Sequence, residues 1–191
     1  MIARLDPKNE ETAMNVLNMY FSSTGNTEKV AKKIEETVGE AGHRVNTLKI
    51  TKNMDVDVLH YDLVFVGSGV YEWLPGKSVM QLFAKLRHRY VDSGDIKPGS
   101  PRRPDTKVVV YCTYGGAHTG ANEAIPAVKY MAQLFDHLGF EIVAEWYIVG
   151  EYRPDKFQEF STTGRLGDIR GRPNEEDLRH LAERVRGILR T

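Results

Sequence analysis

The stretch of sequence that decides the fold is NVLNMYFSSTGNTEKVAKKIEETVGEA, residues 15–41. Its apolar run at residues 16–21 is typical of a strand that is buried on both faces. Six small residues rich in hydroxyl groups, residues 22–27, follow directly. A helix is predicted next, because apolar residues recur at helical spacing, and Gly39 and Gly42 mark its end. The apolar residues of that helix are Val30, Ala31, Ile34, Val38 and Ala41.

The hydroxyl-rich loop at residues 22–27 has the chemistry of a phosphate site. A helix start presents N–H groups without partners inside the helix, together with the positive end of the helix dipole. Gly25 allows the backbone to come close to a ligand. The loop contains no Lys or Arg, and neutral donors suit a phosphate that is held permanently and not transferred. The side chains that can add hydroxyl donors are Ser22, Ser23, Thr24 and Thr27.

Two interpretations of this loop compete. A Ser- or Thr-capped helix after a strand would use the same residues without binding a ligand. The patterns GxxxxGK[ST] and GxGxxG are both absent from the loop. The loop does, however, resemble the phosphate loop of the flavodoxin family, which is written T/S-x-T-G-N-T. The residues that match it in order are Ser22, Thr24, Gly25, Asn26 and Thr27.

The resemblance carries expectations about the cofactor. In the flavodoxin family this loop wraps the ribityl phosphate of FMN, and its place after a first strand near the N-terminus also fits. It implies FMN as the cofactor, bound by residues 22–27. FAD is not expected, because the chain shows no second nucleotide pattern.

The composition indicates one ordinary globular domain. A length of 191 residues fits a single domain at residues 15–191, preceded by an N-terminal extension at residues 1–14. The 26 basic residues balance the 26 acidic ones, so no overall field favours nucleic acid or an acidic membrane surface. No apolar run reaches the length of a membrane span, and no secretory signal opens the sequence. We therefore expect a cytoplasmic protein with neither nucleic acid nor membrane as a partner.

The cysteine and histidine content argues against a disulfide and against a metal site. Cys112 is the single cysteine, and at the end of a predicted strand it is better explained as an inert core thiol than as a nucleophile. No metal is expected, because the histidines outside the predicted site show no ligand spacing. These are His43, His60, His88, His137 and His180.

Strands and helices alternate along the rest of the chain. This alternation predicts an α/β fold with a doubly wound, five-stranded parallel sheet. With a phosphate loop after the first strand, the flavodoxin-like order 2-1-3-4-5 fits, and a ligand would lie between strands one and three. The expected strands are residues 16–21, 44–50, 61–66, 108–112 and 140–149, and the later helices are expected at residues 76–86, at residues 127–138 and from residue 174.

The loop after the third strand, residues 67–76, reads GSGVYEWLPG. Tyr71 and Trp73 stand beside Glu72 in this loop and follow Gly69, where an aromatic side chain can stack on a flavin ring. The alternative is that Trp73 packs on the sheet edge or on a neighbouring subunit. The sequence does not decide which of the two aromatic residues would touch the flavin.

The loop after the fourth strand, residues 113–121, is the second glycine-rich loop. Its glycines would bring backbone amides close to the pyrimidine edge of the flavin, where donors stabilise negative charge. His118 is the candidate catalytic residue, as a donor to the flavin or an acceptor of a substrate proton; the equal alternative is an ordinary loop histidine. The predicted cofactor contacts here are Thr113, Tyr114, Gly115, Gly116, His118 and Gly120.

These features favour an FMN-dependent oxidoreductase that passes electrons to a quinone or a similar acceptor. The electron donor would be NAD(P)H or a reduced redox protein, and the acceptor a small molecule or a protein. Two alternatives stay open: a single-electron carrier for a protein partner, and a flavodoxin-like binding or regulatory module without redox activity. Carrier flavodoxins are typically acidic, whereas this chain is neutral, which slightly favours a reductase. Residues 150–173 could cover the site, dock a redox partner or form a homo-oligomer contact.

Overall fold

The computed structural model describes residues 13–190. Five parallel strands form its sheet in the order β2-β1-β3-β5-β6, which confirms the predicted flavodoxin-like order. A short strand, β4, pairs antiparallel with β3. Most of the N-terminal extension, residues 1–12, lies outside the described residues. The strands are β1 (Asn15–Phe21), β2 (Arg44–Lys49), β3 (Leu63–Tyr71), β4 (Leu74–Pro75), β5 (Arg103–Tyr114) and β6 (Phe140–Val149).

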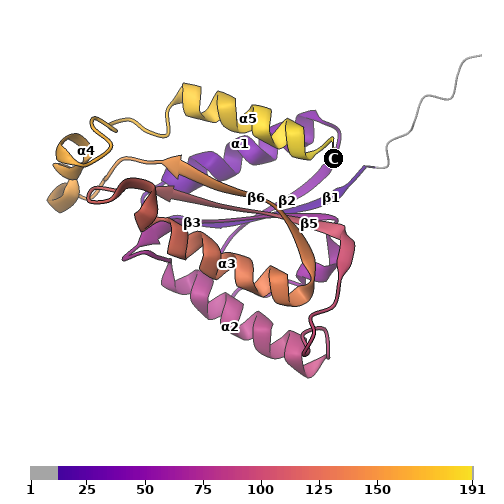
Figure 1. The fold of residues 1–191 in the computed structure, drawn as a ribbon. Helices are drawn as coiled ribbons and strands as arrows, with labels where there is room; N and C mark the ends of the chain where they lie inside the picture. Colours follow the sequence, from indigo (N-terminus) through magenta and orange to yellow (C-terminus); the bar gives the residue numbers. More distant parts are fainter. Residues whose placement is uncertain (1–12, 191) are drawn as a thin grey trace, which may run out of the picture.

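Helices cover both faces of the sheet (Figure 1). Helices α1 (Asn26–Glu40) and α5 (Glu175–Ile188) lie on one face, and α2 (Lys77–Asp92) and α3 (Ile125–Leu138) lie on the other. The short helix α4 lies beyond the carboxyl ends of the strands, at the left of Figure 1. The remaining short elements are η1 (Val58–His60), η2 (Gly120–Glu123), η3 (Asp155–Phe157) and α4 (Phe160–Thr163).

The strands send alternate side chains into two hydrophobic cores. On β1, Leu17 and Met19 enter the core under α2 and α3, while Val16 and Tyr20 enter the core under α1 and α5. Between these positions lies Asn18, which is fully buried. Its amide nitrogen donates to the Ala31 carbonyl at 2.9 Å. The centre of the sheet therefore contains a polar side chain whose bonding capacity is used within the fold.

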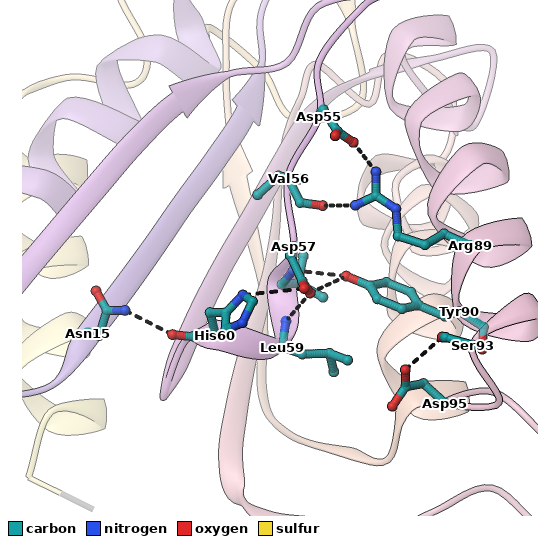
Figure 2. Close-up of polar contacts among 11 residues, drawn as sticks. Asn15, Asp55, Val56, Asp57, Leu59, His60, Arg89, Tyr90, Ser93 and Asp95 are labelled. Carbon is teal, nitrogen blue, oxygen red and sulfur yellow. Dashed lines mark hydrogen bonds and ion pairs between the residues drawn. The ribbon is translucent and has the colours of Figure 1, made fainter.

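The β2–β3 connection is anchored to α2 at the amino edge of the sheet (Figure 2). The Tyr90 hydroxyl donates to Asp57 Oδ1 at 2.9 Å and accepts from the Val58 N–H at 2.9 Å. Burial raises the pKa of Tyr90 well above its ordinary value. Arg89 donates to the Val56 carbonyl at 3.0 Å and also pairs with Asp55. The members of this cluster bind each other, which gives it a structural role.

Several predicted boundaries differ from the structure, most of all those of the third and fourth predicted strands. Residues 67–76 were expected to be a loop, but β3 continues through Tyr71 and pairs with β4 in a two-residue hairpin. The sequence does not predict this hairpin, because its turn residues, Glu72 and Trp73, are not the Asn-Gly or Asp-Gly that mark such turns. The strand expected at residues 108–112 is also longer: it begins at Arg103 and continues through Tyr114, so the loop expected from residue 113 begins after it.

Candidate functional site

Three loops and a fourth segment meet at the carboxyl edge of the sheet. The loop after β1 contacts the β3–β4 hairpin, because Ser23 bonds to Tyr71. It also contacts the end of β5, because Thr27 bonds to Thr113. The fourth segment, residues 150–173, joins β6 to α5 and includes α4. The edge at which the sequence placed the site is therefore built from four parts of the chain.

The loop at residues 22–27 keeps the helix start open. Gly25 precedes α1 with φ +95°, a left-handed conformation that favours glycine, and it provides no side-chain cap. The Ser22 hydroxyl is buried and accepts from the Gly25 N–H at 3.0 Å. The first N–H groups of α1 have no partner inside the helix. The geometry is that of an anion site at a helix N-terminus.

Only part of the predicted donor set faces outward. Ser23 is exposed and Thr24 is half-buried. The Thr27 hydroxyl is buried and lies 2.8 Å from the Thr113 hydroxyl. Asn26 is buried as well, and both ends of its amide bind residues of the 150–173 segment. Thr27 and Asn26 therefore use their side chains to hold the surrounding loops, which the loop pattern alone does not reveal.

The β3–β4 hairpin separates the two candidate aromatic residues. The Tyr71 hydroxyl lies 2.7 Å from Ser23 Oγ, and its ring contacts Phe21 edge-on with centroids 5.9 Å apart. Trp73 is 62% exposed at the tip of the hairpin. A Cβ on Gly69 would lie 3.0 Å from the Tyr71 hydroxyl, so the glycine leaves room for that ring. Tyr71 is thus engaged with the phosphate loop, and Trp73 is the aromatic side chain available for stacking.

The hairpin turn is formed by residues in an unfavourable conformation. Glu72 and Trp73 have φ values of 49° and 69°, as a two-residue turn between right-twisted strands requires. Non-glycine residues in this region cost about 1–2 kcal/mol each. Strain of this kind is concentrated at ligand sites and turns, and here it presents a tryptophan to solvent at the edge that the sequence assigned to a flavin.

The loop after β5 is closed by its own contacts. Tyr114 is 9% exposed and belongs to the core, so it is not placed to stack on a surface ligand. The Glu123 carboxylate accepts from the N–H groups of His118 and Thr119, both at 2.6 Å. Gly116 has φ +55°, and a Cβ there would lie 2.8 Å from the Gly120 carbonyl oxygen. Two of the backbone amides in this loop are therefore occupied.

His118 lies at the outer side of this loop. Its side chain is exposed, and its ring centroid is 5.9 Å from that of Phe160 in an edge-on contact. Gly115 lies on the inner side, where a Cβ would be 2.1 Å from the Tyr152 ring. Tyr152 also packs edge-on against Phe160, at 5.7 Å. Both ends of the loop thus contact the 150–173 segment.

The 150–173 segment supplies residues that the sequence did not assign to the site. Arg153 Nε donates to Asn26 Oδ1 at 3.1 Å, across 127 positions of the chain. The segment also lines an open cavity of about 480 Å³. The sequence left its role open between a solvated connection and a segment that covers the site, docks a redox partner or forms an oligomer contact, and its arginines and glycines were the available signal. The cavity is lined by Glu151, Tyr152, Arg153, Gln158, Ser161 and Arg170.

Two further findings concern the described chain as a whole. Within residues 13–190, no helix has both the length and the apolar character that a bilayer span requires. In the same part of the chain, no group of three or more His, Cys, Asp or Glu side chains is arranged to hold a metal ion. Cys112 is fully buried, and burial raises the pKa of its thiol far above the ordinary value.

Comparison with known proteins supports the geometry. A family model described as a flavodoxin domain matches residues 17–92, which span the phosphate loop and the β3–β4 hairpin. Oxidised flavodoxin 2 from Bacillus cereus superposes with a TM-score of 0.64 at 18% identity, over 92% of this chain and 98% of that one. The fold of the chain is flavodoxin-like.

Two other solved structures share the fold of this flavodoxin-like protein. A mutant flavodoxin from Fusobacterium nucleatum, bound to flavin mononucleotide, matches with a TM-score of 0.58 at 11% identity, over 90% of this chain and 92% of that one. Rubredoxin oxygen:oxidoreductase from Desulfovibrio gigas matches with a TM-score of 0.60 at 16% identity, over 92% of this chain but only 35% of that one. At these identities the likeness concerns the fold.

Proposed function

We propose that this flavodoxin-like protein binds FMN at the carboxyl edge of its sheet and transfers electrons through it. The observation that carries the proposal is the uncapped start of α1 after Gly25, in a hydroxyl-rich loop and at the same sheet edge as the exposed Trp73. Bound FMN would supply the redox chemistry, which none of the protein's side chains provides.

The residues present fit the chemical parts of FMN. The phosphate suits the N–H groups at the start of α1 together with the hydroxyls of Ser23 and Thr24. The flat isoalloxazine ring suits the exposed Trp73, since an aromatic side chain can stack on it. The buried Thr27 and Asn26 keep the loops in place around the ligand. One phosphate loop supports FMN in preference to FAD.

We further infer an oxidoreductase that takes electrons from NAD(P)H or a reduced redox protein and delivers them to a quinone or a similar acceptor. The neutral charge of the chain, with 26 basic and 26 acidic residues, supports a small-molecule acceptor more than docking driven by opposite charges. His118 is exposed within the second glycine-rich loop, where it can exchange a proton with a substrate. The cytoplasm is the expected compartment.

A second candidate is a single-electron carrier for a protein partner. The observation that favours it is the apolar tip of the β3–β4 hairpin, where Trp73 is 62% and Leu74 is 40% exposed. Exposed apolar residues next to a ligand site suit contact with another protein. The two candidates share the cofactor and differ in the acceptor.

The test begins with the purified protein. We expect a yellow protein whose heat-released flavin co-elutes with FMN on chromatography. FAD as the main species would overturn the cofactor assignment, and a protein that neither contains flavin nor binds added FMN would leave the binding or regulatory module as the function. Steady-state assays with NADH or NADPH and a series of quinones, run beside single-turnover assays with ferredoxin-type donors, then separate the reductase from the carrier.

A further inference from the structure

The phosphate loop has no cation of its own, but the fold brings one to it. Residues 22–27 contain no Lys or Arg. Arg153, from the segment after β6, is placed so that a Cβ on Gly25 would lie 3.7 Å from its Nη1 atom. The guanidinium group of Arg153 therefore lies close to Gly25, the residue that precedes α1.

The anchoring of Arg153 leaves its outer nitrogens free. Its Nε atom donates to Asn26 Oδ1 at 3.1 Å and lies 3.2 Å from Glu151 Oε1. Within residues 13–190, neither Nη atom of Arg153 donates a hydrogen bond. An arginine held through Nε presents its two Nη groups as a fork, which is the geometry that binds phosphate oxygens.

The phosphate loop itself fixes the position of the arginine. Asn26 Nδ2 donates to the Glu151 carbonyl at 2.8 Å, while Asn26 Oδ1 accepts from Arg153. A Cβ on Gly150 would lie 2.9 Å from Asn26 Nδ2, so a glycine is needed for this close approach. Asn26, the first residue of α1, thus also holds the segment that contains Arg153 against the phosphate loop.

We propose that Arg153 is a phosphate-binding residue, and that it makes the site select phosphorylated flavin over riboflavin. This inference rests on the proposed function. A flavin phosphate carries nearly two negative charges at neutral pH, and a helix start supplies only about half a positive charge. The Arg153 side chain is 38% exposed and is paired with Glu151, so solvent and this carboxylate reduce its effect without removing it.

The alternative role for Arg153 is structural. It would hold the 150–173 segment to Asn26 and take no part in binding. The two roles predict different effects of removing the Arg153 side chain. If Arg153 binds the phosphate, its removal lowers the affinity for FMN and leaves the affinity for riboflavin unaffected. If Arg153 only holds the 150–173 segment in place, its removal displaces the segment and lowers both affinities.

The experiment compares FMN and riboflavin titrations, followed by flavin fluorescence, on the flavin-free full chain. For Arg153→Gln we expect about a 10- to 100-fold higher Kd for FMN and an unchanged Kd for riboflavin. Arg153→Lys should recover part of the loss, because it keeps the charge but not the fork. The control is Arg186→Gln, which removes an α5 arginine that is paired with Glu40 and lies outside the cavity lining; its FMN affinity should equal that of the wild type.

A variant that is expected to bind FMN more tightly provides a second test. Glu151→Gln removes the carboxylate beside Arg153, so FMN should bind more tightly, and the binding should depend more steeply on salt. The inference is overturned if Arg153→Gln binds FMN as the wild type does, or if it loses FMN and riboflavin affinity equally. Failure of the wild type to bind FMN at all would instead overturn the proposed function, and this inference with it.

Discussion

The hydroxyl of Tyr71 lies 2.7 Å from Ser23 Oγ and accepts from the Ser23 N–H at 3.3 Å. The β3–β4 hairpin is thereby bonded to the phosphate loop through atoms that a bound phosphate would also use. Tyr71 therefore competes with a bound phosphate for the donors of Ser23, and its ring is not free to stack on a flavin. This relationship distinguishes Tyr71 from Trp73, which the sequence left equivalent.

Removal of the Tyr71 hydroxyl should free the Ser23 donors. We expect Tyr71→Phe to bind FMN several-fold more tightly, since one hydrogen bond contributes about 1 kcal/mol net. Tyr61→Phe is the matched control, because its hydroxyl accepts from Asn46 at 3.1 Å, away from the loop. Fluorescence titration of both variants gives the answer; weaker binding by Tyr71→Phe would mean that the hydroxyl holds the loop in its binding shape.

The two threonines of the loop should respond differently to mutation. Thr24 is half-buried in the phosphate loop. If its hydroxyl binds the phosphate as proposed, Thr24→Ala should raise the Kd for FMN about 10- to 100-fold. Thr27→Val leaves the buried Thr113 hydroxyl without its partner and should lower the free energy of unfolding by about 1–3 kcal/mol.

Replacement of both partners provides the control for that stability loss. In Thr27→Val combined with Thr113→Val, no buried hydroxyl is left unpaired, so most of the lost stability should return. Denaturant unfolding of the single and double variants measures this. Additive losses would show that the two hydroxyls act independently, contrary to their 2.8 Å contact.

The start of α5 should make stability depend on pH. Asn174 and Asp177 form a capping box, and Arg172 pairs with Asp177. Burial alone would raise the pKa of Asp177, but the bonds from Arg172 and from the Asn174 N–H outweigh it and lower that pKa. A lowered carboxyl pKa stabilises the fold above the unfolded value near 4, and this contribution is lost as the pH falls through the folded value.

Asp177→Asn should therefore be less stable than the wild type by roughly 1 kcal/mol at pH 7. The difference should shrink as the pH falls from about 4 toward the lowered folded pKa, because Asp177 becomes protonated there and then carries no more charge than asparagine. Urea unfolding at pH 7 and pH 3 tests this, with Glu176→Gln as the control, since Glu176 is exposed in the same turn. An Asp177→Asn deficit that stays constant between these pH values would rule out the ionised pair as its cause.

The parts of the fold that follow apolar periodicity were predictable from the sequence. β1 and α1 follow directly from residues 15–41, and the doubly wound parallel sheet follows from the alternation of strands with helices. The strand order was predicted from the place of the phosphate loop after the first strand and from its resemblance to the flavodoxin family. The phosphate loop was recognisable because its small residues lie together in the chain. In contrast, the direction of the Thr27 hydroxyl depends on Thr113, 86 positions away, which no local pattern reports.

The other features that the sequence did not predict also depend on contacts between distant parts of the chain. The 150–173 segment lacks a repeating apolar pattern, and its contact with the loop joins Arg153 to Asn26 across 127 positions. The burial of Tyr114 depends on the core that α3 completes. Tertiary contacts, and not local propensity, decide these positions.

The hairpin turn offers a test that separates stability from function. Glu72 and Trp73 both have positive φ values, whereas Asn-Gly is the pair that such a turn prefers. Glu72→Asn with Trp73→Gly should therefore raise the free energy of unfolding by about 1 kcal/mol, since relief of backbone strain exceeds the entropy that glycine adds to the unfolded chain.

The same double variant should bind FMN less tightly and leave the bound flavin more fluorescent, because it removes the exposed aromatic ring. Glu72→Asn alone is the control that relieves part of the strain and keeps Trp73; its flavin fluorescence should match the wild type. Thermal unfolding of the flavin-free proteins and fluorescence of the loaded ones measure the two effects. If the double variant gains stability while the fluorescence and affinity of its flavin stay unchanged, then Trp73 does not contact the flavin and the turn strain serves another purpose.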